Sequence, residues 1–493
     1  MSTQTFAPPL PRQPLGQILV LALILLVEIL VLCLPIIWWG YLGLALLCAV
    51  SAFALMRSVV YARATGVLLC WMLIFPLGYY YASFPKTQPI ITLDRTFIVV
   101  LLVAATFARA RGALHIPGDV RKSAIWWLVF LVVAAITLPR TKSPLGGLRL
   151  LVDGFCLPGV LAWFVLRWID VRKHLSAFHV AACVMSIYIA GIGLAEVVTQ
   201  RDLLVLPESA VILAGNVNED ATQIWVRPNG PFATTNSYAL IGLVSFLLLL
   251  FLRKALQGHV PGWQRCLHKF GLAGALLTSF LPLFRSVLTS LVVIGVIDAF
   301  YSKGIRRLLR VGVLCSFFLL VLLMQLALPQ ILEDRTDPEN VFGRIAEQRQ
   351  ILTMFMDNPI IGVGLNNFHD AAQKSKYVAY YQGVESVDYP HNNLGAVLVE
   401  TGLSGIIPFA VSQFFLVLAF RRLCKRRNQS LVWKFFLFIF LAYWVNGMSL
   451  ASAYYSDLNL WYMLALAMLY KFAETGEAPD AGRVSHPTLP CCV

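Results

Sequence analysis

Residues 329–359 read PQILEDRTDPENVFGRIAEQRQILTMFMDNP, and they begin a polar stretch that ends at Pro390. On both sides of this stretch the chain is a succession of apolar segments, each about 17–25 residues long, which is the length that crosses a bilayer as a helix. The polar stretch is therefore predicted to be one large loop outside the membrane. Because it leads directly into His391 at the start of the next span, any chemistry is expected there.

The composition is typical of a polytopic membrane protein. Hydrophobic residues make up 59% of the 493 residues, charged residues 13%, and the mean hydropathy is +0.74. No soluble core of this size needs so much apolar surface. The first apolar run is too long for a signal peptide, and no small-residue cleavage site follows it, so an uncleaved first span is expected.

An all-α fold with about 14 transmembrane helices is predicted. The stretch from Ile18 to Met56 would extend about 60 Å as one helix, so it must cross the membrane twice. The spans are placed at residues 18–38, 40–56, 64–83, 93–110, 123–139, 150–167, 175–198, 235–252, 268–283, 285–302, 307–328, 394–420, 431–448 and 455–472.

The distribution of positive charge predicts the orientation. With both termini in the cytoplasm, about two thirds of the 39 lysines and arginines lie on the inner side. The same rule divides Phe270–Tyr301, which could otherwise be one long tilted helix, into two helices joined by an outer turn at Arg285, where Pro282 helps to break the helix. The formal charge of +14 is then mostly a topology signal, so no nucleic-acid partner is expected.

Three regions are predicted along the chain. They are N-terminal membrane helices over 1–234, a second membrane region over 235–472 that includes the outer loop 329–390 and is expected to hold any catalytic site, and a disordered cytoplasmic tail over 473–493. None of the ten cysteines falls in a predicted outer loop, so no disulfide framework is expected. The tail ends in Cys491-Cys492, which lacks partners at metal-ligand spacing, and its role stays open.

The large loop contains a predicted amphipathic helix. Asp337-Pro338 is a helix-start signal and Asn358-Pro359 a stop signal. Apolar residues recur between them at helical spacing, so the helix is expected to lie on the outer surface with its apolar face toward the spans. These residues are Val341, Phe342, Ile345, Leu352, Phe355 and Met356. A turn is predicted at Gly362-Val363-Gly364, which lacks the lysine and the strand of a phosphate-binding loop.

Only two of the eight histidines, His369 and His391, fall on the predicted outer side. His391 follows Tyr389-Pro390, a pair that disfavours helix before the proline and suits a helix start just after it. Its imidazole is expected at the end of a membrane helix, where it either faces a cavity or serves only as a cap. For His369 a plain surface role is favoured.

Arginines provide the candidate anion-binding groups. Arg285 is costly to place at membrane depth unless it meets an anion or a water-filled cavity. Arg344 and Arg227 lie in the two sizeable outer loops, and guanidinium groups suit bidentate phosphate contact. Glu400, inside the next span, is either a buried hydrogen-bonding residue or part of the cavity. No Asp-x-Asp lies outside, so a metal-independent site for a lipid-linked diphosphate is predicted.

Several motifs together resemble the O-antigen ligase and Wzy-type polymerase superfamily. They are Gly343-Arg344-Ile345, the run from Asn358 to Phe368, His391-Asn392-Asn393-Leu394, and the run from Glu400 to Gly405. Arg285-Ser286 resembles the upstream turn of that superfamily, with Phe284 where a serine is usual, and Gly230 to Asn236 is a looser fit. The resemblance covers roughly residues 225–410, and the first seven spans match only in being hydrophobic.

The resemblance implies a GT-C-like, inverting glycosyltransferase of the bacterial inner membrane that makes lipopolysaccharide or exopolysaccharide, with its active site on the periplasmic side. Carried over, His391 is the catalytic residue, Arg285, Arg344 and Arg227 bind diphosphate, and Glu400 and Asn392 support them. The donor is an undecaprenyl-diphosphate-linked glycan. The acceptor is the lipid A core for a ligase or another lipid-linked repeat for a polymerase. No cofactor is implied, and a flippase and a chain-length regulator are the expected partner proteins.

A membrane transporter or flippase of lipid-linked sugars is the alternative, because fourteen spans is a common transporter count. Transporters are typically built from repeated halves with broken helices at the midplane. The sequence shows no corresponding halves, since nothing like the loop 329–390 occurs earlier in the chain. A scaffold of a secretion complex would need no outward histidine.

Overall fold

The computed structural model describes residues 64–81, 92–107, 118–200, 203, 227–232, 234–256, 260–301, 304–305, 312, 338–386 and 389–475. The predicted spans at 18–38 and 40–56, the predicted span at 307–328 apart from residue 312, and residues 476–493 of the predicted tail lie outside the described residues. The predicted start of the tail at 473 is wrong, because Ala473 and Glu474 still belong to the last helix, whose hydrogen-bonded turns continue to residue 475. The chain divides into two units, residues 1–63 with 99–109 and residues 64–98 with 110–493. The contacts and sites below belong to the second unit.

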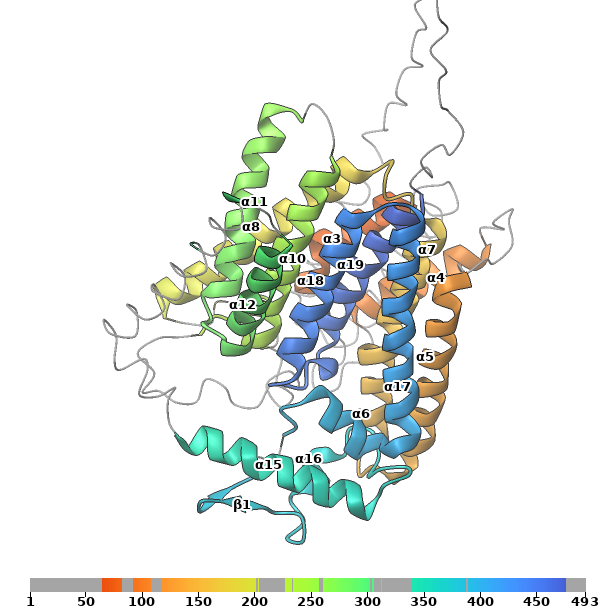
Figure 1. The fold of residues 1–493 in the computed structure, drawn as a ribbon, viewed down its shortest axis with the longest axis vertical. Coiled ribbons are helices and arrows are strands. Elements are labelled where there is room, and N and C mark those ends of the chain that lie inside the picture. Colours follow the sequence, from red (N-terminus) through yellow and green to blue (C-terminus); the bar gives the residue numbers. More distant parts are fainter. Residues whose placement is uncertain are drawn as a thin grey trace, which may run out of the picture. The chain divides into compact units, whose positions relative to one another are not determined.

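The described chain is almost entirely helical (Figure 1), which confirms the all-α prediction. Its membrane-type helices are α3 (Ala64–Tyr81), α4 (Leu93–Phe107), α5 (Gly118–Thr137), α7 (Leu157–Trp168), α8 (Leu175–Thr199), α10 (Thr235–Ala255), α11 (Gly262–Phe280), α12 (Arg285–Phe300), α17 (Asn393–Arg426), α18 (Ser430–Gly447) and α19 (Ser456–Glu474). Shorter elements link them, namely η1 (Leu138–Arg140), α6 (Pro144–Arg149), the π-helix η2 (Leu150–Cys156) and η3 (Ser452–Tyr454).

Six stretches of described residues are long and apolar enough to cross a membrane, so the chain is a membrane protein. They are Gly118–Arg140, Pro144–Trp168, Leu175–Thr199, Thr235–Ala255, Asn393–Arg426 and Ser430–Gly447. The total of fourteen spans, the orientation and the location of the termini stay predictions.

The predicted break at Arg285 is present. Helix α11 ends at Phe280 and α12 begins at Arg285, so Phe270–Tyr301 is two helices rather than one. Between them Leu283 adopts a φ of +50°, and its N–H donates to the Phe280 carbonyl at 2.8 Å. Helix α11 starts at Gly262, earlier than the predicted span at 268, because its first turns are polar.

Helices α5 and α17 lie side by side along their lengths (Figure 1). Near one end Ser123 and Ser412 exchange hydrogen bonds, each hydroxyl donating to the other residue's carbonyl, at 2.9 and 3.0 Å. Farther along, the rings of Phe130, Phe155 and Phe409 form a buried aromatic cluster. Buried hydroxyls and aromatic packing thus hold α17 against α5. His391 lies two residues before the start of α17.

The region 338–386 forms what we call the loop assembly. It consists of α15 (Pro338–Asp357), α16 (Phe368–Ala372) and a two-stranded antiparallel hairpin of β1 (Tyr380–Tyr381) and β2 (Val384–Glu385), in which Tyr380 pairs with Glu385 (Figure 1). The bounds of α15 confirm the predicted start and stop signals. The hairpin was not predicted, because two residues per strand are too few to show a period.

The expected orientation of the α15 apolar face is wrong in part. Val341, Leu352 and Met356 are exposed, whereas Ile351 and Met354 pack inward into a core with Phe368, Ala371, Ala372, Tyr377 and Val399. The inward stripe also contains two polar residues, Glu347 and Gln350, both fully buried. Each is kept inside by a hydrogen bond, because a buried polar group without a partner would be costly. The Gln350 amide donates to the Ala372 carbonyl at 3.1 Å.

Candidate active site at the Glu347–His391 pair

His391 lies between the loop assembly and the start of α17, and one carboxylate holds it at two points. Its ring nitrogen Nδ1 is 2.9 Å from Glu347 Oε2, and its backbone N–H donates to Glu347 Oε1 at 2.7 Å. The Glu347 side chain is 0% exposed and that of His391 is 20% exposed. Because an ionised carboxylate only accepts hydrogen bonds, Nδ1 is the nitrogen that carries the proton in the neutral ring, and the lone pair of that ring is then on Nε2.

Within the described part of the chain no residue forms a hydrogen bond with Nε2 of His391. The arrangement has the geometry of a general base whose tautomer and orientation are set by a buried carboxylate. The N-cap of α17 is Asn392 rather than His391, and its Oδ1 accepts from the N–H groups of Leu394 and Gly395 at 2.9 and 3.3 Å.

Glu347 was missed by the sequence prediction, although a signal for it is present. The buried positions of α15 are Gly343, Ala346, Glu347, Gln350, Ile351 and Met354, which follow helical spacing. A carboxylate on this stripe has to find a partner inside the protein. The partner is 44 residues away in sequence, and only the folded loop brings the two together.

Arg344 and Arg285 come from different elements and influence each other. Arg344 lies one turn before Glu347 on α15, and Arg285 is the first residue of α12; both are exposed. Surrounding protein lowers the pKa of the Arg344 guanidinium from its ordinary value, Glu347 raises it, and the charge of Arg285 lowers it again. Arg285 is therefore near enough to Arg344 for its charge to act there, and Arg344 is in turn near Glu347. Such a pair of guanidinium groups is suited to an anion with more than one negative charge.

Hydrogen bonds between α12 and α18 hold the backbone that follows Arg285 in place. Ser286 Oγ donates to Asn446 Oδ1 of α18 at 2.5 Å, and Asn446 Nδ2 donates to Ser452 Oγ at 2.7 Å. One turn later Ser290 Oγ reaches the Ala442 carbonyl at 3.2 Å. Asn446 was not predicted as a supporting residue, because a lone asparagine in an apolar span carries no spacing signal. The hydrogen bonds of Asn446 stabilise the turn in which Arg285 lies.

Residues 359–364 and 399–404, which belong to two of the motifs compared with the superfamily above, are joined by backbone hydrogen bonds. We call this pair of segments the clasp. Val363 and Gly364 donate to the carbonyls of Val399 and Glu400 at 2.9 and 3.0 Å. In return Leu403 and Ser404 donate to the carbonyls of Pro359 and Ile360 at 2.8 and 3.0 Å. The clasp joins the end of α15 to the first third of α17 and so sets the position of Glu347 relative to His391.

Gly402 makes the clasp possible. It has φ +62° and ψ −164°, a conformation that interrupts α17 and is open essentially only to glycine. A Cβ there would also meet the backbone of Ile360. The predicted turn at Gly362-Val363-Gly364 is confirmed, with φ +76° at Gly362 and +109° at Gly364.

Glu400 acts as a buried hydrogen-bonding residue, which is one of the two roles expected for it from the sequence. It is buried, and its Oε1 accepts the backbone N–H of Phe368 at the start of α16 at 3.1 Å. Neighbouring residues of the same loop are tied to the end of α5. Leu365 N–H donates to Thr137 Oγ1 at 3.1 Å, and Arg140 Nη1 donates to the Gly362 carbonyl at 2.8 Å.

Arg227 lies in a separate loop that leads into α10. The neighbouring Gly230 N–H donates to Glu196 Oε2 of α8 at 2.7 Å, which anchors this loop. Its assignment to the site stays a prediction. His369 is half-buried and stacks on Tyr389, with ring centroids 4.9 Å apart, and its Nε2 contacts Gln373 at 3.1 Å. The surface role favoured for it stays a prediction.

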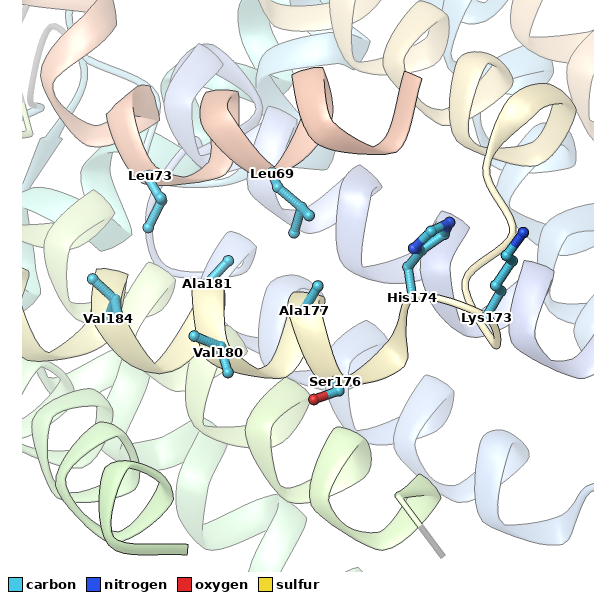
Figure 2. Close-up of a pocket in the computed structure, with 9 residues that line it drawn as sticks. All are labelled: Leu69, Leu73, Lys173, His174, Ser176, Ala177, Val180, Ala181 and Val184. Carbon is cyan, nitrogen blue, oxygen red and sulfur yellow. The ribbon is translucent and has the colours of Figure 1, made fainter. Parts of the chain in front are cut away.

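A groove of about 500 Å³ lies between α3 and α8 (Figure 2). Leu69 and Leu73 of α3 face Ala177 and Val180 of α8 across it, and His174 lies at one end. None of its lining residues comes from the loop assembly or from α17, so it is not part of the Glu347–His391 site.

Residues 232–410 match the family model described as O-Antigen ligase. The matched region begins just before α10 and ends within α17, so it contains Arg285, Arg344, Glu347, His391 and the clasp, and it begins after Arg227. No protein with a curated function matches the chain significantly.

Proposed function

The chain belongs to the O-antigen ligase and polymerase superfamily through residues 232–410, and on this premise we propose that it transfers a glycan from undecaprenyl diphosphate to a sugar hydroxyl. The reaction takes place at the periplasmic face of the bacterial inner membrane, in surface polysaccharide synthesis. The observation that carries the proposal is the buried Glu347 carboxylate bound to His391 Nδ1 at 2.9 Å, which leaves Nε2 as the base.

In the proposed reaction His391 Nε2 accepts the proton of the acceptor hydroxyl. The hydroxyl oxygen forms a bond to the anomeric carbon while the bond from that carbon to the diphosphate oxygen breaks. The electron pair leaves with undecaprenyl diphosphate, and attack from the opposite side inverts the configuration. Glu347 stabilises the imidazolium that forms and keeps its ring oriented, as a buried acid does beside a catalytic histidine.

Arg344 and Arg285 hold the diphosphate. Negative charge grows on its bridging oxygen as the glycosidic bond breaks, and guanidinium groups already in place offset that charge without reorganisation. An anion bound between them would meet both positive charges. Arg227 is proposed as a further phosphate contact on the opposite loop. Asn392 and Glu400 support the site through the α17 cap and the α16 start.

The acceptor is either the lipid A core or a second lipid-linked repeat, since both reactions need the same donor site. A ligase would leave free lipid-linked polymer in a deletion strain, whereas a polymerase would leave single-repeat products. A flippase that delivers the donor and a chain-length regulator are the proposed partner proteins.

The test compares His391→Ala with His369→Ala in a deletion strain. Both residues are histidines of the same region, but only His391 contacts Glu347. We expect His391→Ala to lower glycan transfer by about 10²- to 10⁴-fold, the usual contribution of a general base. His369→Ala should stay within a few-fold of the parent. Surface polysaccharide is measured on gels, and membrane content of each variant by immunoblot.

Two results would argue against the proposal. Normal glycan output from His391→Ala at normal protein level would end the enzyme interpretation. Loss of donor transport into the outer leaflet in that variant would favour the flippase alternative. The purified protein, supplied with a lipid-diphosphate glycan and a chelator, is expected to retain activity, and activity restored only by added divalent metal would contradict the arginine-based site.

A further inference from the structure

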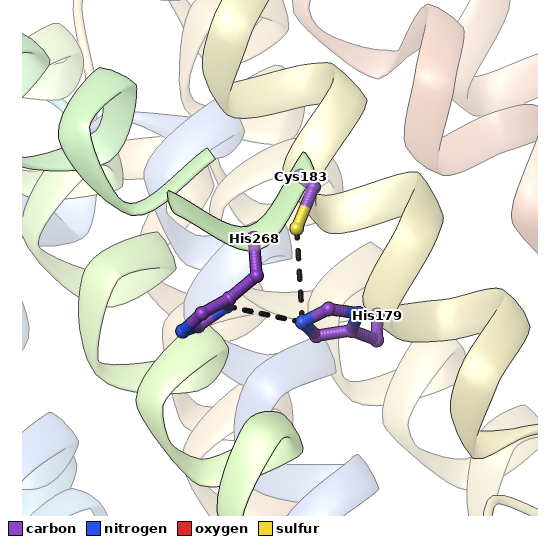
Figure 3. A group of neighbouring side chains, drawn as sticks. All are labelled: His179, Cys183 and His268. Carbon is purple, nitrogen blue, oxygen red and sulfur yellow. Dashed lines mark hydrogen bonds between the residues drawn. The ribbon is translucent and has the colours of Figure 1, made fainter. Parts of the chain in front are cut away.

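A second histidine cluster lies inside the bundle, between α8 and α11. His179 and Cys183 occupy successive turns of α8, and His268 faces them from α11 (Figure 3). His179 Nε2 is 3.1 Å from His268 Nδ1 and 3.8 Å from Cys183 Sγ. All three atoms lie within 4.8 Å of one another. His179 and Cys183 are buried, and His268 is half-buried.

The separations of His179 from His268 and from Cys183 are close to those of a zinc coordination sphere, and the third separation, between His268 and Cys183, is within 4.8 Å. Zinc binds nitrogen at about 2.0–2.1 Å and sulfur at about 2.3 Å in a tetrahedron, which places two nitrogens about 3.3 Å apart and a nitrogen and a sulfur about 3.6 Å apart. The pair of histidines therefore needs to open by only a few tenths of an ångström. Two imidazoles and one thiolate are a ligand set that zinc accepts, with a fourth position for water.

The neighbours of His179 can orient it for metal binding. Its Nδ1 is 3.0 Å from the Gln264 amide nitrogen, and Ser176 Oγ is within 3.3 Å of both polar atoms of that amide. If the amide turns over, its oxygen accepts from Nδ1–H and the Ser176 hydroxyl adapts. His179 Nε2 then presents its lone pair to the metal. Metal-binding histidines almost always have such a partner on the other ring nitrogen.

The packing of the two helices brings the three ligand atoms together. A Cβ at Gly271 of α11 would lie 2.8 Å from the Cα of Cys183, and one at Gly274 would lie 2.7 Å from the Ser186 carbonyl oxygen. The close approach at these glycines sets the distance between α8 and α11 at the level of the cluster. Arg253 is a charged neighbour of both histidines; its charge favours neutral imidazole rings, which are the forms that bind metal, and it also repels the cation.

We propose that His179, Cys183 and His268 form a Zn²⁺-binding site that links α8 to α11. On binding, the thiol of Cys183 loses its proton to solvent, the histidines bind as neutral rings, and the His179–His268 hydrogen bond is replaced by two metal–nitrogen bonds. The site is independent of the Glu347–His391 pair, and its metal is not required for the transfer chemistry proposed above.

The test measures metal retained by the full-length protein in detergent. The protein carries an affinity tag without histidine, and Cys491→Ser with Cys492→Ser removes the terminal thiols from every sample. After chelation, incubation with Zn²⁺ and desalting, mass spectrometry of the metal should find about one Zn²⁺ per chain. His179→Ala and Cys183→Ser should each lower this at least about tenfold. Cys156→Ser and His174→Ala, which lie outside the cluster, should match the parent.

Cobalt supplies a second readout that reports on the thiolate itself. Co²⁺ bound to the parent should show a sulfur-to-metal charge-transfer band, and Cys183→Ser should lose it while keeping the melting temperature of the metal-free parent. Equal zinc retention by the parent and His179→Ala, or no retention by the parent, would overturn the proposal. In that case the cluster is only a hydrogen-bonded contact between two helices.

Discussion

His391 and His179 both contact neighbouring side chains, but they differ in how many of their ring nitrogens these contacts occupy. His391 uses one ring nitrogen on a buried carboxylate, and no described residue takes the other. His179 has both ring nitrogens in contact with neighbours, Gln264 on one side and His268 on the other. A base needs a lone pair that a substrate can reach, and of these two histidines His391 has the arrangement that the proposed proton transfer requires, whereas His179 links two helices.

The two histidines are also held in place by different kinds of contact. His391 is positioned by the loop assembly and the clasp, which are held by backbone and charged groups between segments far apart in sequence. His179 is positioned by glycine-dependent packing of α8 against α11. Changes at the first location should alter activity, and changes at the second should alter stability or metal content.

The largest effect is expected for Glu347→Gln, which keeps the shape of the side chain but removes its charge. The amide can no longer stabilise an imidazolium and allows the wrong tautomer of His391. Transfer should fall by about 10²- to 10⁴-fold. The measurement is initial rate in membranes against protein content. A fall in protein level with unchanged rate per molecule would instead assign Glu347 a purely structural role.

The next effect separates two arginines of the same helix. Arg344→Ala should lower the transfer rate by about 10²- to 10³-fold, because a preorganised charge at the diphosphate is lost. Arg349 is the matched control, since its guanidinium lies 4.9 Å from the Tyr381 ring and its Nη1 contacts the Tyr380 carbonyl on the hairpin. Arg349→Ala should change the rate only a few-fold. Equal losses of transfer rate in Arg344→Ala and Arg349→Ala would show that α15 contributes general positive charge rather than a specific contact from Arg344.

A pair of glycine variants compares the clasp with the bundle. Gly402→Ala forces a side chain into a conformation that costs about 1–3 kcal/mol, and Gly274→Ala overpacks the α8–α11 contact by a similar amount, about 1–3 kcal/mol. Both should lower the melting temperature. Only Gly402→Ala should also lower the rate per folded molecule, because the clasp sets the Glu347–His391 distance. The same rate loss in Gly274→Ala would remove the distinction between the two regions.

The smallest effect is expected for Lys376→Ala at the exposed side of the loop assembly. Lys376 Nζ contacts Asp357 Oδ2 at 2.7 Å, and both side chains are exposed. The lysine lowers the pKa of Asp357, so any stability from the pair is present at neutral pH and fades as the pH falls through the folded-state pKa of that carboxyl. Thermal melts at neutral and acidic pH should barely separate variant from parent, since surface pairs contribute little. A clear loss at neutral pH would contradict this.

The membrane class, the break at Arg285, the bounds of α15 and the start of α17 were all predictable from sequence. Each depends on a local signal, namely span length, proline and capping residues, or the distribution of charge. The inward face of α15 was not predictable, because its apolar residues lie on more than one side and the buried stripe includes Glu347 and Gln350. Which side faces inward depends on partners that are distant in the sequence.

By itself the sequence determined that the chain is helical, enters a membrane and has a polar loop with arginines leading to His391, because these properties follow from runs of neighbouring residues. Tertiary structure decided which groups meet. It joined Glu347 to His391, paired the clasp through Gly402, and gathered His179, Cys183 and His268. Such meetings depend on side-chain contacts between separate helices, and a single sequence carries no periodic signal for a contact across 44 or 89 positions.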